Sequence, residues 1–134
     1  MLRISAKDGA WELIQEIEEI SGQNVYACYQ CGKCGAGCPL SFGMDLLPYQ
    51  VIRLLQLGMG PMALEARSIW LCVGCLTCAT RCPKAVDPAR LMEALRAILL
   101  RRGEVPAGMV LLPSDVIAAV PQQASVAASR KLTL

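Results

Sequence analysis

The sequence predicts a mainly α-helical fold in which two cysteine loops are each followed by a helix, with the two halves related by a pseudo-two-fold axis. The apolar fraction is 54% but includes only one Phe, two Trp and three Tyr, so smaller aliphatic residues must fill most of the interior. That mixture favours helices over strands. A loop-and-helix unit also occurs twice within 134 residues, a length that fits one domain.

Two cysteine motifs define the repeat. Residues 28–39 read CYQCGKCGAGCP and residues 72–83 read CVGCLTCATRCP, so four cysteines and a proline recur 44 residues apart. The aligned pairs are Cys28 and Cys72, Cys31 and Cys75, Cys34 and Cys78, Cys38 and Cys82, and Pro39 and Pro83. Eight thiols would rarely fall into register by chance. The chain therefore contains a duplicated unit.

Each motif is followed by the signature of a helix. Asp45 precedes LLPYQVIRLLQLG, and Asp87 precedes PARLMEALRAILLRRG. Both stretches combine an acidic N-cap, a proline tolerated in the first turn and an apolar helix, and they end at Gly58 and Gly103. We therefore expect equivalent helices after the two cysteine loops.

Two further helices are expected around these units. Residues 9–21 predict an amphipathic helix with Trp11, Ile14 and Ile17 on one face. Residues 61–70 predict a short helix that leads into the second motif.

The C-terminal region differs in composition from the rest of the chain. It has three prolines, no cysteine and many small residues, so we expect an extended tail with a short helix at 114–119. The expected organisation is a cysteine-containing domain over residues 1–103 and a tail over 104–134 that becomes ordered against a partner.

Three kinds of chemistry use cysteines at this density. A disulfide framework is disfavoured because the N-terminus does not read as a secretory signal, and cytosolic thiols stay reduced. Zinc typically takes two C-x2-C pairs separated by a longer loop. The run C-x2-C-x2-C-x3-C-P is instead that of 4Fe-4S ferredoxins. The sequence therefore predicts two 4Fe-4S clusters, with a zinc-stabilised interaction module as one alternative.

The same run predicts how the ligands are shared. Glycines let the backbone approach a cluster closely and point N–H groups at its sulfurs; they are Gly32, Gly35, Gly37 and Gly74. In two-cluster proteins of this pattern the fourth cysteine ligates the other cluster. One expected ligand set is Cys28, Cys31, Cys34 and Cys82, and the other is Cys72, Cys75, Cys78 and Cys38.

Composition argues against several other functions. The 13 basic and 11 acidic residues nearly balance, which gives no indication of a nucleic-acid partner. No apolar run approaches the about 18 residues that a membrane span needs, and we expect a cytoplasmic protein. There is no histidine, dinucleotide fingerprint or P-loop. We therefore expect a redox subunit without a substrate site of its own.

The chain resembles the C subunit of heterodisulfide reductase, the HdrC-like family. The resemblance rests on the two motifs, on SIWLC running into the second, and on a leading helix, and it covers residues 10–102. It implies an alpha-helical ferredoxin fold. It also implies that electrons pass between an HdrA-like flavoprotein and an HdrB-like catalytic subunit in a hetero-oligomeric complex.

A second family shares the cysteine pattern. Iron-sulfur subunits of succinate dehydrogenase, fumarate reductase and glycolate oxidase contain a similar helical ferredoxin domain. The other alternative is therefore the iron-sulfur subunit of a membrane-bound, quinone-linked dehydrogenase. The compact chain and the SIWLC stretch favour the heterodisulfide reductase family.

Overall fold

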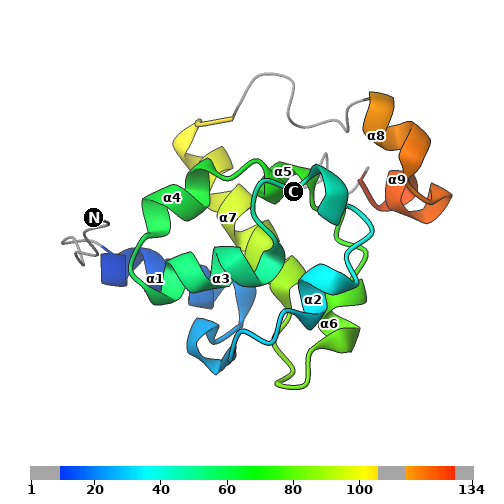
Figure 1. The fold of residues 1–134 in the computed structure, drawn as a ribbon. Coiled ribbons are helices and arrows are strands. Elements are labelled where there is room, and N and C mark those ends of the chain that lie inside the picture. The colour runs from blue at the N-terminus through cyan, green and yellow to red at the C-terminus, as the bar shows by residue number, and fades with distance from the viewer. Residues whose placement is uncertain (1–9, 106–113, 129–134) are drawn as a thin grey trace, which may run out of the picture.

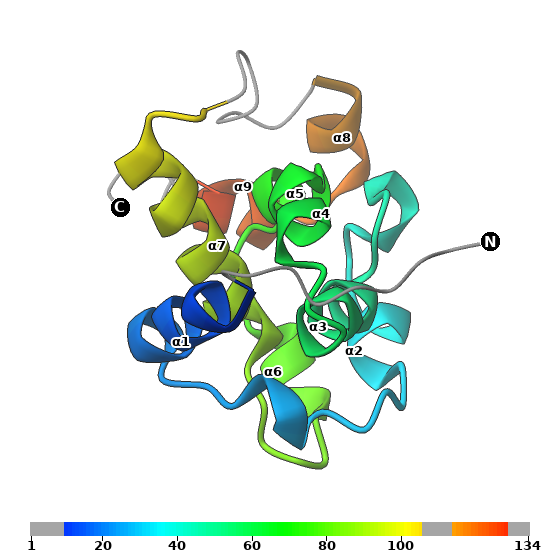
Figure 2. The same ribbon diagram turned by 90° about the vertical axis from the view of Figure 1, so that its left-hand side faces the viewer.

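Short helices surround one long helix in this protein. The computed structural model describes residues 10–105 and 114–128, and these contain helices but no strand. In chain order the α-helices are α1 (Ala10–Ser21), α2 (Lys33–Ala36), α3 (Pro48–Gln56), α4 (Gly60–Glu65), α5 (Ser68–Leu71), α6 (Thr77–Arg81), α7 (Pro88–Arg102), α8 (Ser114–Ala119) and α9 (Gln122–Ala128). Helix α7 contacts α1, α3, α4, α5 and α6 (Figures 1 and 2). The predicted mainly α fold is confirmed.

The main apolar core lies where these helices meet α7. Ile17 of α1, Leu55 of α3 and Leu95 of α7 are each 0% exposed. Burying one such side chain contributes about 1.5–3 kcal/mol. Trp11, which was expected on the same helical face as Ile14 and Ile17, is 59% exposed, whereas those two residues are buried. It is the second residue of α1, and the buried face of that helix begins at Leu13.

The two repeat helices begin differently. Asp87 is the N-cap of α7, as predicted, and its side chain accepts a hydrogen bond from the N–H of Arg90. The equivalent prediction for Asp45 is wrong, because α3 begins two residues later than expected, with Leu47 as its N-cap. The Gln50 side chain accepts the N–H of Leu47 instead, at 2.9 Å.

Asp45 caps a different helix. Its carboxylate accepts the N–H groups of Arg67 and Ser68, each at 2.9 Å, at the start of α5. The prediction of a single short helix over residues 61–70 is also wrong. This segment forms α4 and α5, with a break between them where Asp45 binds. Asp45 thereby ties the segment after the first motif to the segment that leads into the second.

Both repeat helices end at the expected glycines. Gly58 and Gly103 have φ values of 71° and 69°, a left-handed conformation that glycine adopts without steric cost. The next N–H group donates back into each helix, from Met59 to Leu54 O at 2.8 Å and from Glu104 to Leu99 O at 2.9 Å. These bonds satisfy carbonyl groups at the helix end.

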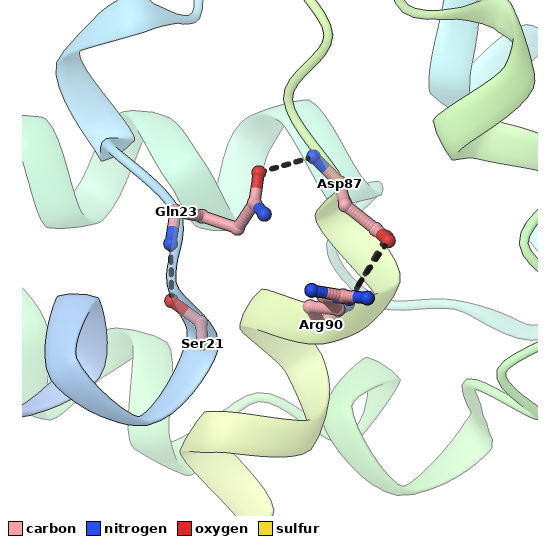
Figure 3. Close-up of polar contacts among 4 residues, drawn as sticks. All are labelled: Ser21, Gln23, Asp87 and Arg90. Atoms are coloured by element: carbon pink, nitrogen blue, oxygen red, sulfur yellow. Dashed lines mark hydrogen bonds and ion pairs between the residues drawn. The ribbon is translucent and has the colours of Figure 1, made fainter.

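The loop after α1 is joined to the start of α7. The side-chain oxygen of Gln23 accepts the N–H of Asp87 at 2.9 Å, and the N–H of Gln23 donates to the hydroxyl of Ser21 (Figure 3). Asp87 also forms an ion pair with Arg90 at 3.5 Å (Figure 3). The leading helix and the second repeat helix are therefore fixed to each other at the residue that caps α7.

The C-terminal segment packs on the rest of the protein. The expected helix at 114–119 is present as α8, whereas the expectation of an extended chain is wrong for residues 122–128, which form α9. Val116 of α8 and Ala124 of α9 are buried in a second apolar group with Leu40, Leu71 and Val73. Parts of the expected tail, residues 106–113 and 129–134, lie outside the described residues.

Candidate metal centre

One cavity contains three thiols of the first motif and one of the second. We call it the first cavity. Its empty volume, part of which opens to solvent, is about 340 Å³. Its four cysteines are Cys28, Cys31, Cys34 and Cys82. The aromatic ring of Tyr49 and the aliphatic side chains of Ile52 and Val86 form much of the remaining wall.

A matching cavity contains the other four thiols. This second cavity has an empty volume of about 380 Å³, also partly open to solvent. Its four cysteines are Cys72, Cys75, Cys78 and Cys38. Apolar side chains complete its wall, among them Leu40, Met44, Val73 and Met92.

Each cavity therefore takes its fourth thiol from the other motif. Helix α2 of the first motif packs against α6 of the second, which brings the two loops together. Burial raises the pKa of the Cys38 thiol, and the nearby thiols of Cys72 and Cys75 raise it further. Cys38 is thus electrostatically coupled to the second motif. The structure brings together the two sets of four cysteines that the sequence predicts.

Two left-handed residues shape each cysteine loop. The φ angles are 66° and 77° at Gln30 and Gly32, and 66° and 64° at Gly74 and Leu76. Gln30 is equivalent to Gly74 in the repeat, and Gly32 to Leu76. This conformation costs about 1–2 kcal/mol for a residue other than glycine. The strain at Gln30 and Leu76 is of the kind found at functional sites, where the surroundings impose a geometry.

Burial raises the pKa of one thiol in the first cavity and of two in the second, where Cys38 has been described. Burial raises the pKa of the Cys34 thiol, and the thiols of Cys28 and Cys31 raise it further. Burial also raises the pKa of Cys78 to about 12, with the thiol of Cys72 as the next contribution. A metal that binds here as a thiolate complex must therefore displace protons.

Several polar groups hydrogen-bond to the sulfur atoms. The side-chain amide of Gln30 donates to Cys28 Sγ at 3.4 Å, and the N–H of Val86 donates to Cys82 Sγ at 3.3 Å. In the second loop, Thr77 Oγ1 lies 3.3 Å from Cys75 Sγ. Hydrogen bonds of this kind orient thiolate ligands and contribute to the potential of a bound cluster.

Two side chains that sequence reasoning missed hold the start of the loops. Gln56 Nε2 donates to the carbonyls of Val25 and Cys28 at 2.8 and 2.9 Å. Arg96 Nη1 donates to the carbonyls of Ile69 and Cys72 at 2.6 and 3.0 Å. Each donor lies eight residues after the proline that begins its helix, Pro48 in α3 and Pro88 in α7. Aligning the helices on their prolines would have revealed this correspondence.

The donor chemistry of both cavities fits iron-sulfur clusters. Four thiols and mainly apolar neighbours surround each cavity, and thiolates are the usual ligands of 4Fe-4S clusters. Within residues 10–105 and 114–128, no three Cys, Asp or Glu side chains lie close enough together to hold a single metal ion. The thiols are spread around the cavity walls.

Comparison with known proteins identifies the class of domain. The model of the 4Fe-4S dicluster domain family matches residues 24–86, a range that includes all eight cysteines. The chain therefore carries an iron-sulfur dicluster domain, built here in an alpha-helical ferredoxin fold. None of the described helices has the length and apolar character needed to cross a membrane.

Curated relatives narrow the class to one family. The iron-sulfur C subunit of the CoB–CoM heterodisulfide reductase of Methanopyrus kandleri is 33% identical over 93 residues, covering 69% of this chain and 48% of the relative. The corresponding C 2 iron-sulfur subunit of Methanocaldococcus jannaschii is 34% identical over 83 residues, covering 62% of this chain and 44% of the relative. A third relative is the C2 subunit of the H(2)/formate:CoB-CoM heterodisulfide,ferredoxin reductase of Methanococcus maripaludis, 31% identical, covering 70% of this chain and 53% of the relative.

The chain belongs to the family of heterodisulfide reductase C subunits. It spans about half the length of the curated relatives it matches.

Proposed function

We propose that this chain is an electron-transfer subunit that holds one 4Fe-4S cluster in each cavity. The proposed ligands of the first cavity are Cys28, Cys31, Cys34 and Cys82, and those of the second are Cys72, Cys75, Cys78 and Cys38. The observation that carries the proposal is the crossed grouping of the thiols, since each cavity needs both motifs to complete a set of four. Each bound cluster would supply one-electron redox chemistry.

The protein contributes shielding and proximity to this function. Apolar walls limit the access of water to both cavities, and solvent exposure is one determinant of cluster potential. The two thiol sets are close enough to influence each other, because Cys34 of the first cavity contributes to the raised pKa values of both Cys38 and Cys78 in the second. This proximity supports electron exchange between the cavities.

The family supplies the proposed partners. The relatives are subunits of CoB–CoM heterodisulfide reductases by name. We infer that this chain likewise works in a hetero-oligomeric, cytoplasmic complex, between an HdrA-like flavoprotein and an HdrB-like catalytic subunit. The substrate reduced by such a complex would bind to the catalytic subunit.

A division of the chain follows from the same proposal. Residues 1–103 would form the cluster-holding domain, and residues 104–134 would form an appended segment that contributes to docking. Exposed apolar side chains on this segment support docking, since Ile117 of α8 and Val126 of α9 both face outward.

Anaerobic purification tests the cofactor proposal. The protein should contain about eight iron atoms and about eight labile sulfides per chain, as two 4Fe-4S clusters require. It should be brown and should bleach on reduction. Zinc without labile sulfide would refute the proposal and favour an interaction module.

Affinity purification from the native host, without oxygen, tests the partner proposal. A flavin-containing protein and a second cysteine-rich subunit should co-purify without detergent. A membrane anchor or cytochrome in their place would refute the heterodisulfide-reductase-like complex and assign the chain to a quinone-linked dehydrogenase.

A further inference from the structure

We propose that the buried guanidinium of Arg96 raises the reduction potential of the cluster in the second cavity above that of the cluster in the first. This inference rests on the proposed function, since it concerns clusters held by the two thiol sets. Arg96 is not a ligand, but its charge would help to determine which of the two clusters holds an electron.

The two halves of the protein provide an internal comparison. Gln56 and Arg96 occupy the same position in their helices, eight residues after the first proline. Each donates hydrogen bonds to the carbonyl of the first cysteine of its motif and to the carbonyl three residues earlier. The halves therefore share one structural contact, made by a neutral amide in the first and by a cation in the second.

The positive charge is not needed for that contact. Gln56 makes both hydrogen bonds as a neutral side chain. Arg96 is only 2% exposed, and its Nε atom is buried without a hydrogen-bond partner. In the part of the chain that the structure describes, the one ion pair joins Arg90 and Asp87, so Arg96 has no carboxylate within ion-pairing distance.

An isolated buried cation is costly unless negative charge lies nearby. A cluster held by four thiolates is anionic, and Arg96 Nη1 lies 3.0 Å from the backbone oxygen of Cys72, a member of the second set. Adding an electron to that cluster increases its negative charge. A nearby buried cation favours the reduced form because Coulomb interactions are weakly screened away from water.

Other charged groups lie near the cavities, but each is exposed or paired. Lys33 and Arg81, within the two motifs, are exposed. Lys84 lines the first cavity, but its side chain is exposed, with its ammonium group 5.8 Å from the ring centre of Tyr29. Asp87 contributes to the raised pKa of Cys78 in the second cavity, but Arg90 offsets its charge. Water screens an exposed charge far more than a buried one. Arg96 should therefore dominate the difference between the two sites.

Replacing Arg96 with glutamine makes the second half resemble the first. In Arg96→Gln, the reduction equilibrium of the second-cavity cluster should fall at least tenfold, equivalent to 59 mV for one electron. The cluster in the first cavity should shift much less. Potentials of both clusters would be measured by a redox titration followed by electron paramagnetic resonance, in the complete chain purified anaerobically.

Two variants separate charge from structure. Arg96→Lys keeps the cation and should restore most of the potential that Arg96→Gln loses. Arg101→Gln removes an exposed charge from the last turn of the same helix and should leave both potentials unchanged. An unchanged second-cavity potential in Arg96→Gln, or an equal shift of both clusters, would overturn the inference.

The unmodified protein provides a test that does not require the Arg96 variants to fold. Cys31→Ser and Cys75→Ser would identify the spectra of the first and second cavities, because each cysteine belongs to one of them. The second cavity should have the higher potential, and a lower potential there would overturn the inference. A protein without iron and labile sulfide would instead refute the proposed function itself.

Discussion

Arg81 lies against Gly37, the residue that occupies the same position in the other half of the repeat. A Cβ atom at Gly37 would meet the Nε, Cδ and Cζ atoms of the Arg81 side chain. Equivalent residues meet in this way when two halves pack face to face around a pseudo-two-fold axis. The contact occurs where α2 and α6 bring the two motifs together, so it bears directly on the crossed thiol sets.

The Gly37 contact should depend on Arg81 alone. Gly37→Ala should lower the free energy of unfolding by at most about 1 kcal/mol, the low end of the usual overpacking cost, because the exposed Arg81 side chain can move aside. In the double variant with Arg81→Ala, most of that loss should disappear. Chemical unfolding of the unmodified protein, the two single variants and the double variant measures the coupling between Gly37 and Arg81. A loss from Gly37→Ala that is equally large when Arg81 is already alanine would contradict the assigned contact.

Gly35 should tolerate a methyl group less well. A Cβ atom there would lie 2.9 Å from Cε1 of Tyr49 and 3.3 Å from Cβ of Leu47, on side chains that cannot move aside as Arg81 can. We expect Gly35→Ala to cost about 1–3 kcal/mol and to loosen the first cavity, which Tyr49 lines. Loss of the cluster to a chelator should be faster for the first cavity than for the second. Equal loss from both cavities would contradict this explanation.

The left-handed conformation of Gly32 gives a prediction about backbone strain. Its φ is 77°, and a Cβ atom would meet only ordinary contacts, the closest at 3.8 Å from Tyr49. Gly32→Ala should therefore cost about 1–2 kcal/mol through backbone strain alone. Gly32→Asn should cost less, since asparagine tolerates this region better. Thermal unfolding of the two variants measures the difference, and an alanine variant as stable as the unmodified protein would contradict the assigned strain.

Asp45 should stabilise the protein over a defined pH range. Partial burial alone would raise the pKa of Asp45, but the N–H groups of Arg67 and Ser68 that donate to its carboxylate lower it. A lowered pKa means that the folded state favours the charged carboxylate. This contribution is complete above the unfolded carboxyl pKa of about 3.9 and disappears as the pH falls through the folded value.

Asp45→Asn tests that pH dependence. The variant should lose about 1 kcal/mol of unfolding free energy, typical for a weakened helix cap. This loss should stay constant between about pH 7 and pH 5, because Asp45 of the unmodified protein is ionised in both the folded and the unfolded state over that range. Urea unfolding at several pH values measures it. A deficit that shrinks within that range would show that another group is responsible.

Packing of the C-terminal helices predicts protection of the second cavity. Val116 of α8 is buried beside Leu40 and Val73, which also line that cavity. Val116→Asp places a charge in this apolar group, so α8 should detach and the second-cavity cluster should be lost faster to oxygen or a chelator. Ile117→Asp changes an exposed neighbour and serves as the matched control. Equal rates of loss in the two variants would contradict a protective role.

Sequence patterns predicted the parts of the site that depend on local spacing. The C-x2-C-x2-C-x3-C-P pattern, present twice, predicts two crossed ligand sets, and the structure places the same residues around two cavities. The glycines that end α3 and α7 were also predictable, because left-handed helix ends favour glycine. The spacing within each motif and the glycines at the helix ends are encoded within a few residues, whereas the crossed sets depend on the two motifs, which lie 44 residues apart.

Features that depend on tertiary contacts could not be predicted in the same way. Asp45 has the sequence signature of an N-cap, yet its partners lie more than twenty residues away at the start of α5. Arg96 resembles any arginine on an amphipathic helix until the fold buries it against Ile69 and Cys72. Helix α9 consists of small and polar residues that by themselves indicate no core, and Ala124 becomes buried only by packing.

The crossing of the fourth cysteines is the central claim, and serine variants test it most directly. Cys31→Ser and Cys75→Ser provide reference spectra for damage to the first and second cavities. Electron paramagnetic resonance of reduced Cys38→Ser should match the damage seen in Cys75→Ser, and that of Cys82→Ser should match Cys31→Ser. The reverse pattern, with Cys38→Ser resembling Cys31→Ser, would show that each motif holds its own cluster.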